Sequence, residues 1–347
     1  NETSVSESPL RIVIVGGVAG GASAATRARR MKEQAEIILF EKDEYVSFAN
    51  CGLPYYIGDE IKERDKLFVA TPEFLAKRYR LDVRVRQEVM SIDRGKKSVK
   101  VHDHETQATY EQSYDKLILA PGARPIVPPL DGLDAPNVYV LRNVEDTDRI
   151  KEATHRASHK RVVVVGAGFI GLEMVEQLAR IGFETSLVEL QPQVLPLLDA
   201  EMAQPLAKEL QQNGVALHVG AGLKRVVVDD AGVATAVELD NGHTMPADLV
   251  ILGIGVRPNH ELAKAAGLEL GDDGGICTNE FSQTSDPDIY AVGDAAHYEH
   301  GPTGKRMRVA LAGPANRAGR LAGQHAATGS SRPMAPVMGT AIVRVFA

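Results

Sequence analysis

The chain contains two cysteines, Cys51 and Cys277, and they are the side chains best suited to redox chemistry. They lie far apart in the sequence and have none of the spacings that bind metals, so we expect no metal site and no disulfide framework. The lack of a disulfide framework indicates a reducing, cytoplasmic setting. A lone cysteine is commonly a small buried apolar residue. That is our interpretation of Cys277, within the segment GGICTNE.

Cys51 has a different neighbourhood. It precedes Gly52-Leu53-Pro54-Tyr55, and proline is tolerated in the first turn of a helix. We therefore predict Cys51 at a helix N-terminus, where free N–H groups and the dipole favour the nucleophilic thiolate. No second cysteine follows within a few residues, which excludes a CxxC-type disulfide. The oxidised form is then a mixed disulfide with a small thiol or a sulfenic acid.

A glycine-rich turn near the N-terminus predicts the first nucleotide-binding unit. The order is strand, glycine turn, helix, strand and acid, over Arg11–Val15, Gly16–Gly21, Ala22–Met31, Glu36–Phe40 and Glu41. The glycines permit a close approach of a pyrophosphate to the helix N-terminus, and the acid accepts hydrogen bonds from a ribose. The pattern departs from G-x-G-x-x-G at one position, because Val18 stands where the middle glycine is usual.

A second copy of this unit has the full pattern. Its first strand, Arg161–Val165, leads into the glycine motif GAGFIG, which contains Gly166, Gly168 and Gly171. A helix over Leu172–Arg180, a second strand over Thr185–Val188 and the acid Glu189 follow. A carboxylate at the last position favours a free ribose 2′-hydroxyl and repels a 2′-phosphate. We therefore expect NADH in preference to NADPH. Two such units in one chain indicate two nucleotide-binding domains of the doubly wound α/β class.

Short strand-like segments follow each unit and predict small antiparallel inserts. They are Leu81–Val85, Ser98–Val101 and Gln107–Tyr114 in the first set, and Leu223–Val228, Ala234–Leu239 and Met245–Asp248 in the second. Each set leads to an apolar strand that ends in glycine, Lys116–Gly122 or Leu249–Gly255, where the chain is expected to cross between domains. Later, the strand Ile289–Val292 delivers Gly293 and Asp294 toward the start of a helix. There the aspartate would either cap the helix or accept hydrogen bonds from a polyol such as the ribityl chain of a flavin.

Length and composition agree with a two-domain globular protein. The chain has 347 residues, 44% of them apolar, and its net charge of −7 argues against a general nucleic-acid partner. There is neither an apolar run long enough for a transmembrane helix nor a visible signal peptide, so we expect no membrane partner. Residues 1–9 are polar and predict a disordered leader. Gly339–Ala347 predicts a strand in which the sequence stops, as in a truncated chain.

Four motifs in order carry a resemblance to a known family. They are GGVAGG, SFANCGLPYYIG at Ser47–Gly58, GAGFIGLE at Gly166–Glu173 and IYAVGDAA at Ile289–Ala296. From Arg11 onward the chain resembles the single-cysteine flavoprotein disulfide reductases, in which replacement of the middle glycine in the first motif is usual. SFANCGLPY and LAGPANRAGR (Leu311–Arg320) are most similar to coenzyme A–disulfide reductases and their persulfide-reductase relatives.

The resemblance implies two Rossmann-like domains. An FAD domain would comprise residues 10–122 and 256–330, and an NAD(H) domain would comprise residues 123–255. Residues 331–347 would begin a C-terminal dimerisation domain, most of which is expected to be missing from this chain. A homodimer is therefore implied for the full-length family rather than for this chain.

The resemblance and the glycine motifs together give a set of expected site residues, with Cys51 as the catalytic residue and no metal. FAD is expected on Gly16, Gly17, Val18, Ala19, Gly20, Gly21, Glu41, Lys42, Asn50, Ala120, Pro121, Gly122, Gly293 and Asp294. NADH is expected on Gly166, Gly168, Phe169, Ile170, Gly171, Glu173, Glu189 and Gly255. Coenzyme A is expected, as a substrate or a Cys51 adduct, on Ser23, Arg27, Arg30, Ser47, Asn50, Arg78 and Asn316, with Arg317 as a further candidate.

The helical spacing of three of these residues indicates, by itself, a solvated basic helix face, and it is the resemblance that implies a phosphate ligand for them. Ser23, Arg27 and Arg30 share one helix face, and coenzyme A carries a 3′-phosphate and a pyrophosphate that suit arginine. The predicted function is FAD- and NAD(P)H-dependent reduction of coenzyme A disulfide, persulfide or polysulfide. Two alternatives stay open: an NADH oxidase or peroxidase that uses a Cys51 sulfenic acid, and a non-catalytic flavin-binding fragment or redox sensor.

Overall fold

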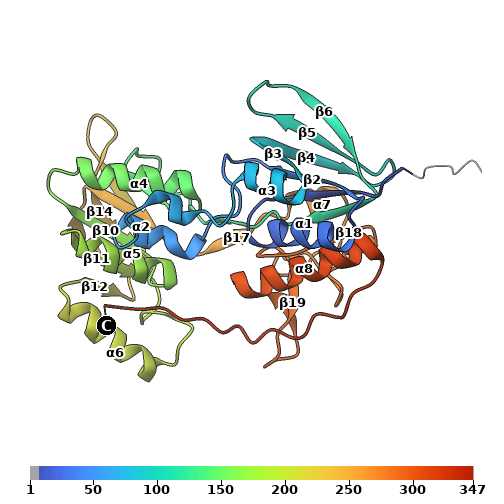
Figure 1. The fold of residues 1–347 in the computed structure, drawn as a ribbon. Helices are drawn as coiled ribbons and strands as arrows, with labels where there is room; N and C mark the ends of the chain where they lie inside the picture. The colour runs from blue at the N-terminus through green and yellow to red at the C-terminus, as the bar shows by residue number, and fades with distance from the viewer. Residues whose placement is uncertain (1–7, 347) are drawn as a thin grey trace, which may run out of the picture. The chain divides into compact units, whose positions relative to one another are not determined.

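The structure is a computed structural model that describes residues 8–346. The chain forms two compact units (Figure 1). Unit 1 comprises the chain up to Phe48, Phe68–Ala123 and Pro258–Ala341. Unit 2 comprises Ala49–Leu67, Arg124–Arg257 and the chain from Ile342 onward. The paired strands β8 (Ala123–Pro125) and β17 (Val256–Pro258) carry the chain between the units.

Unit 1 is built on a five-stranded parallel sheet in the order β18 (Ile289–Ala291), β7 (Lys116–Leu119), β1 (Arg11–Val15), β2 (Glu36–Glu41) and β3 (Asp82–Val85). The strand order reverses beside β1, because β2 lies on one side of it and β7 on the other. Such a reversal opens a crevice at the carboxyl ends of the strands, where α/β proteins bind ligands. The β-branched and leucine side chains of β1, β2 and β7 are almost fully buried, as expected for a sheet covered on both faces.

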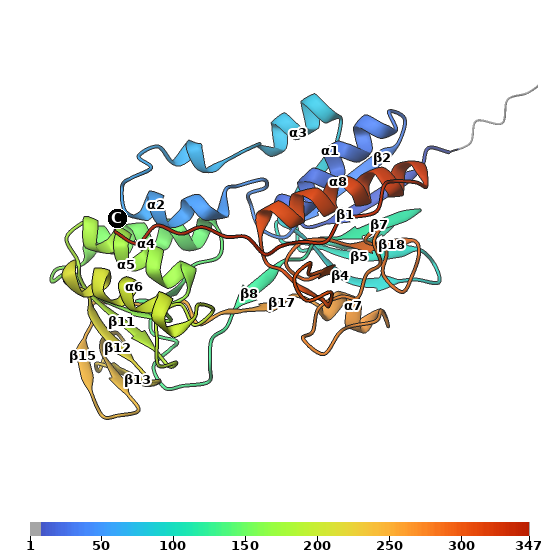
Figure 2. The ribbon, with the colours of Figure 1, turned by 90° about the horizontal axis from the view of Figure 1, so that it is seen from below.

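The helices of unit 1 are α1 (Ala19–Met31), α3 (Pro72–Tyr79), α7 (Glu261–Ala265) and α8 (Ala312–Thr328). Helices α1 and α8 lie side by side although they are almost 300 residues apart in sequence (Figures 1 and 2). Small residues allow this contact. A Cβ atom built on Gly319 or Gly323 would lie 2.3 Å from a backbone oxygen of α1, of Gly20 or Ala24. The strand pair β19 (His297–Glu299) and β20 (Arg306–Arg308) completes the unit.

Unit 2 repeats the plan, with the parallel sheet order β12 (Ala216–Val219), β11 (Glu184–Glu189), β10 (Arg161–Val165), β16 (Leu249–Leu252) and β9 (Val138–Val140). Its helices are α2 (Leu53–Ile57), α4 (Val144–Arg156), α5 (Phe169–Arg180) and α6 (Ala200–Gln212). An antiparallel insert is formed by β13 (Leu223–Val228), β14 (Ala234–Leu239) and β15 (Thr244–Pro246). The expected α/β class with two Rossmann-like sheets and antiparallel inserts is confirmed.

The first insert differs from its prediction. It consists of β4 (Gln87–Asp93), β5 (Ser98–Asp103) and β6 (Thr109–Ser113), whereas the predicted member Leu81–Val85 lies in the parallel sheet as β3. The sequence runs from β3 into β4 without a glycine or proline. Arg86 separates the two strands with a backbone φ of 54°, and this turn redirects the chain from one sheet to the other.

Three further predictions need correction. Both motif helices begin earlier than expected, at Ala19 and Phe169, because the last glycine of each loop is already helical. No helix begins at Asp294, since the chain turns there and enters β19. The segment from Gly339 to Phe346 forms no strand, because no strand pairs with it, and Ala347 lies outside the described residues. Most of the predicted leader, residues 1–7, lies outside the described residues. Its last two residues, Ser8 and Pro9, form no helix or strand.

Candidate active site

The first glycine loop lies at the crevice of unit 1, between β1 and α1. Gly16 has a φ of 100° and donates its N–H to Phe40 O at 2.8 Å. A Cβ atom on Gly16 would lie 2.0 Å from Ala120 O, and one on Gly21 would lie 1.7 Å from Gly16 O. Glycine is therefore required at both positions, for conformation and for space. Val18 is extended, with φ −104° and ψ 160°, which any residue can adopt, so the missing middle glycine does not disturb the loop.

Glu41 ends β2 beside this loop. Its carboxylate accepts hydrogen bonds from Gly17 N at 3.0 Å and Asp43 N at 2.9 Å, and only 8% of the residue is exposed. Burial raises the pKa of Glu41 to about 6, against the opposing effect of the two N–H donors. A carboxylate at this position suits a ribose, as the sequence predicted. Lys42 directly follows it.

The remaining residues of unit 1 expected to bind FAD lie at the same edge of the sheet. Ala120 follows β7 and donates its N–H to Val15 O at 2.7 Å; Pro121 and Gly122 come next. Gly293 follows β18 with a φ of 85°, and a Cβ atom there would meet nothing within 4 Å. The glycine-lined loop, the buried acid and this open position fit a dinucleotide such as FAD. Asn50 is the exception among the expected residues, because it belongs to unit 2.

The second glycine loop in unit 2 repeats this geometry. Gly166 has a φ of 106°, and a Cβ atom on Gly171 would lie 1.8 Å from Gly166 O. Glu189 accepts hydrogen bonds from Ala167 N and Gln191 N, both at 2.9 Å. A Cβ atom on Gly168 would meet nothing within 4 Å, which leaves space at the N-terminus of α5 for a phosphate. Phe169 and Ile170 form the first turn of α5, and Gly255 (φ 113°) follows β16 by a short loop.

Glu173 on α5 is held by residues that the sequence analysis did not select. The Tyr55 hydroxyl donates to Glu173 Oε1 at 3.3 Å, and the Arg344 guanidinium lies 5.4 Å from the centre of the Tyr55 ring. Burial, with the charges of Glu173 and Glu176, raises the pKa of Tyr55 to about 12, so the phenol keeps the proton that it donates. Burial also raises the pKa of Glu173. Arg344 could not be predicted from the sequence as a neighbour of Tyr55 and Glu173, because it lies far from both in the chain and belongs to no motif.

Cys51 lies in a 3₁₀ turn, η1 (Asn50–Gly52), directly before α2. The turn is closed by Gly52 N donating to Ala49 O at 2.9 Å, and Pro54 occupies the first turn of α2. The expected helix start after Cys51 is therefore present, but α2 has only five residues and its dipole is correspondingly small. Cys51 is exposed, and its sulfur is a free thiol.

The segment that carries Cys51 and Asn50 packs in unit 2, whereas the prediction assigned it to the first domain. Leu53 and Ile57 are buried against α4 and α5. Lys151 Nζ on α4 donates to Tyr56 O at 2.6 Å and reinforces this packing. Ser47, two residues before the segment, stays in unit 1 and donates its N–H to Gly17 O at 2.9 Å.

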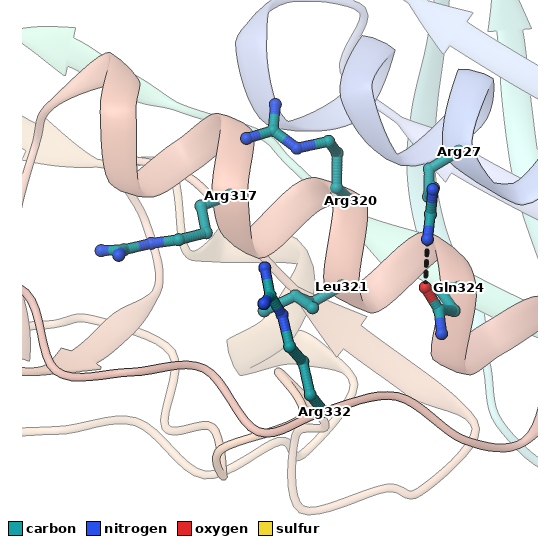
Figure 3. A pocket seen from close by; sticks show the side chains of 6 residues that line it. All are labelled: Arg27, Arg317, Arg320, Leu321, Gln324 and Arg332. Atoms are coloured by element: carbon teal, nitrogen blue, oxygen red, sulfur yellow. Dashed lines mark hydrogen bonds between the residues drawn. The ribbon is translucent and has the colours of Figure 1, made fainter.

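An arginine-lined cavity of about 430 Å³ lies in unit 1 beside α8. Figure 3 shows Arg317 and Arg320 on α8, Arg27 opposite them on α1, and Arg332 on the segment after α8. None of the six lining residues is acidic; Leu321 and Gln324 are the other two. Within residues 8–346, Arg317 Nε is buried without a hydrogen-bond partner. We call this the arginine cavity.

The structure separates the residues expected to bind coenzyme A. Arg27 lines the arginine cavity and donates to Gln324 Oε1 at 2.6 Å, as the dashed line in Figure 3 marks. Ser23 Oγ donates to Asn316 Oδ1 at 2.8 Å, so this pair also joins α1 to α8. Arg30 turns away and donates to the Tyr79 hydroxyl at 3.0 Å. Arg78 is exposed on α3.

Arg320 and Arg332 were missed by the sequence analysis. The spacing of Arg317 and Arg320 on one helix was a usable signal. Arg332 was not detectable in this way, because Gly329, with a φ of 79°, turns the chain back along α8.

Comparison with known proteins decides the family. The model of the pyridine nucleotide-disulphide oxidoreductase family matches residues 10–319. The chain belongs to this family. It is 34% identical to the coenzyme A disulfide reductase of Staphylococcus aureus (strain JH9), over 97% of this chain and 75% of that protein.

Two solved structures are also similar to this oxidoreductase. One is reduced CoADR-RHD of Bacillus anthracis, with a TM-score of 0.92 and 45% identity over 97% of this chain and 60% of that chain. The other is an NAD-dependent persulfide reductase from A. fulgidus, with a TM-score of 0.92 and 36% identity over 97% and 62%. The chain thus spans about three fifths of the length of these two proteins. The predicted class, an oxidoreductase of the flavin- and nicotinamide-dependent type, is confirmed.

Two other features, a metal centre and a membrane-spanning helix, are both absent from residues 8–346. Residues 8–346 contain no group of three or more histidine, cysteine, aspartate or glutamate side chains placed to hold a metal ion. None of the helices in the described part of the chain combines the length and apolar character needed to span a membrane.

Proposed function

We propose that this chain reduces coenzyme A disulfide, or the persulfide of coenzyme A, with electrons from NADH and with Cys51 as its redox-active thiol. Cys51 is exposed and free, and its own unit has no second cysteine to form a disulfide with it. Its disulfide partner is therefore a small thiol. The Cys51 thiolate attacks one sulfur of the substrate disulfide, a new S–S bond forms on Cys51, and one coenzyme A leaves as thiolate. Two electrons from NADH then reduce this mixed disulfide, and the second coenzyme A leaves.

Both nucleotides are assigned to the glycine loops. Gly16–Gly21 and Glu41 would hold FAD, and Gly166–Gly171 with Glu189 would hold NADH through its free ribose hydroxyls. Bound FAD would supply the two-electron relay between a nicotinamide and a thiol. Tyr55, protonated because of its raised pKa, fixes the carboxylate of Glu173 on the helix that begins at the NADH loop. We assign to Glu173 the orientation of the nicotinamide.

The arginine cavity is the observation that carries the coenzyme A proposal. A cavity lined by four arginine residues and no acidic residue favours a ligand with several negative charges. Coenzyme A has a 3′-phosphate and a pyrophosphate, whereas peroxide and oxygen have no group that would use these arginines. The cavity therefore favours this substrate over the chemistry of an NADH oxidase or peroxidase.

The decisive experiment compares the wild-type chain with Cys51→Ser under anaerobic conditions. The FAD-loaded proteins are mixed with NADH and coenzyme A disulfide, and NADH consumption is followed. We expect turnover in the wild type and none in Cys51→Ser, while both still bind FAD. Undiminished turnover in Cys51→Ser would overturn the proposal. Fast NADH consumption with peroxide or oxygen, and without an effect of coenzyme A disulfide, would instead indicate an oxidase or peroxidase.

A second experiment tests the arginine cavity. We expect Arg320→Gln and Arg332→Gln to raise KM for coenzyme A disulfide about tenfold each, because each removes a charge-assisted contact to phosphate. Turnover of pantethine, the corresponding disulfide without the nucleotide, should not change. Arg156→Gln, an exposed arginine on α4, serves as the matched control. Equal losses on both substrates would remove coenzyme A phosphate from the cavity.

Mass spectrometry of the purified chain tests the adduct and the assembly together. An adduct of coenzyme A on Cys51 is expected, and we further propose that the protein is a cytoplasmic homodimer. An FAD-bound protein without turnover or adduct would favour the non-catalytic fragment or sensor.

A further inference from the structure

Cys277, which the proposed function leaves unused, lies beside a histidine. Its sulfur is 3.9 Å from His297 Nδ1, and the residue is partly exposed. The backbone fixes this neighbourhood. Ile276 and Ala296 form a parallel bridge, His297 N donates to Ile276 O at 3.0 Å, and Thr278 Oγ1 donates to His297 O at 2.9 Å. The thiol and the imidazole are therefore neighbours because their two chain segments are hydrogen-bonded to each other.

The His297 ring is held in one orientation. Only 7% of the residue is exposed, and its Nε2 lies 2.7 Å from Asp273 Oδ1. Two glycines enclose the ring. A Cβ atom on Gly271 would lie 2.3 Å from His297 Cε1, and one on Gly275 would lie 2.4 Å from His297 Cδ2. The imidazole thus occupies the space that side chains at these two positions would take, and it packs directly against the backbone of this loop.

Asp273 is itself oriented. Its carboxylate accepts hydrogen bonds from Gly275 N at 2.9 Å and Arg308 N at 3.3 Å. Burial alone would raise its pKa, but the hydrogen bonds from His297 and Gly275 hold the pKa of Asp273 below its ordinary value. In the neutral tautomer that donates its Nε2–H to Asp273, His297 presents Nδ1 to the sulfur as an acceptor. Nucleophile, base and orienting acid thus stand in the order that activates a thiol.

We propose that Cys277 is a second reactive thiol, a modification site at which His297 takes the proton of the thiol and a small disulfide forms a mixed disulfide. Cys277, His297 and Asp273 all belong to unit 1, whereas Cys51 belongs to unit 2. The inference therefore goes beyond the proposed function and does not depend on it.

The chemistry is thiol–disulfide exchange. The Cys277 S–H proton moves to His297 Nδ1, and the sulfur attacks one sulfur of the disulfide. The S–S bond between Cys277 and that sulfur forms as the original S–S bond breaks. The second half leaves as a thiolate, which takes up the proton from His297. No external oxidant or reductant is needed, because the disulfide supplies the oxidising equivalents.

The charges around the thiol explain why it needs a base. Burial, with the charges of Glu269, Asp273 and Asp272 and against that of Arg306, raises the pKa of Cys277. The thiol therefore rests in its protonated form at neutral pH, and its deprotonation requires an acceptor for the proton. His297 Nδ1 is the acceptor next to the sulfur. Asp273 also faces the guanidinium of Arg308.

The test isolates Cys277 in the Cys51→Ser background, since the chain has only two cysteines. The folded protein is mixed with dithiodipyridine, release of thiopyridone is followed as a function of pH, and peptide mass spectrometry locates the adduct. We expect His297→Gln to lower the rate at pH 7 at least about tenfold and to move its rise to higher pH. Asp273→Asn, which changes a positioning residue, should lower the rate by a smaller factor with the same displacement of the pH profile.

His300→Gln is the matched control, because His300 lies close in sequence and bonds to Thr303 rather than to a thiol. Its rate and pH profile should equal those of the parent. If His297→Gln does not fold, Asp273→Asn alone decides. Rates and pH profiles that agree within about twofold for all variants would overturn the inference. So would a thiol that reacts only after unfolding. Neither result would bear on Cys51, which is absent from every protein in this test.

Discussion

Glu41 and Glu189 occupy corresponding places in the two units but differ in burial. Each carboxylate accepts one hydrogen bond from a backbone N–H of its glycine loop. It accepts another from the N–H of the residue two positions after the glutamate. Glu41 is buried, whereas Glu189 is partly exposed. Sequence spacing predicted that both acids end a strand beside a glycine loop. It could not predict the difference in burial, which depends on what packs around the end of β2.

The raised pKa of Glu41 predicts a pH dependence of FAD binding. Its folded pKa of about 6 exceeds the ordinary value of 4.5, so the folded chain holds this proton more tightly than the unfolded chain does. The resulting contribution to stability is complete below about pH 4.5 and is lost as the pH rises through 6. A ribose hydroxyl donates to the ionised carboxylate, so binding must displace the proton. We expect FAD affinity to fall below about pH 6, by up to about tenfold per pH unit.

Fluorescence titration of the apoprotein with FAD measures this dependence. The titrations are made from about pH 5 to about pH 8, a range that includes the expected protonation of Glu41. Glu41→Gln should bind FAD more weakly at pH 7 and show no such change with pH. Glu189→Gln is the control, and its FAD affinity should follow the wild-type pH profile. A wild-type affinity that stays constant through pH 6 would contradict the role given to Glu41.

Glu189 makes a second prediction at this scale. Its carboxylate should repel a 2′-phosphate, so Glu189→Ser is expected to lower the preference for NADH over NADPH by about tenfold. Steady-state kinetics with both nucleotides measures the ratio of kcat/KM. Glu184→Ser, at an exposed position on the same strand β11, should leave the ratio unchanged. An unchanged ratio in Glu189→Ser would show that another residue selects the nucleotide.

At the scale of elements, motifs of consecutive residues were predictable from the sequence. Sites that form where distant segments pack together were not. The glycine motifs identified β1, α1 and β2, and β10, α5 and β11, because strand, turn and helix are consecutive in the chain. The split of β3 from β4 at Arg86 was not predictable, since it depends on a positive φ at a residue that does not favour one. The arginine cavity was only half predictable. Arg27 and Arg317 were selected from the sequence, whereas Arg332 reaches α8 through a turn rather than through helical spacing.

The contact of α1 with α8 is the element-scale feature most open to test. Gly319→Ala places a methyl group 2.3 Å from Gly20 O, a backbone atom that cannot move without displacing α1. We expect a loss of about 3 kcal/mol in the free energy of unfolding. Gly313→Ala is the matched control on the same helix, because its Cβ would meet nothing within 4 Å. It should raise the free energy of unfolding by about 0.5–1 kcal/mol.

Denaturant unfolding of both variants, followed by circular dichroism, measures these changes. Equal effects of the two substitutions would mean that the helices separate at little energetic cost. The close approach of Gly20 and Gly319 would then not be what holds α1 against α8.

At the scale of the whole molecule, the chain contains two glycine loops of nearly the same geometry in two separate units. Gly16 and Gly166 have φ values of 100° and 106°. A Cβ atom on Gly21 would lie 1.7 Å from Gly16 O, and one on Gly171 would lie 1.8 Å from Gly166 O. A ligand that binds only the folded form stabilises it, by about 2.7 kcal/mol at a hundredfold excess over Kd. FAD should therefore protect the loop of unit 1, and NADH the loop of unit 2, each without the other.

Hydrogen exchange with mass spectrometry resolves the two loops and decides whether these ligands act on separate units. FAD alone should slow exchange in Gly16–Gly21, and NADH alone should slow it in Gly166–Gly171, because each set of amides faces its own phosphates. Glu41→Gln should weaken only the first protection and Glu189→Gln only the second, so the two variants control each other. If Glu41→Gln also removed the protection by NADH, the unit-2 loop would depend on an occupied unit 1, and its preformed geometry would not be sufficient for binding.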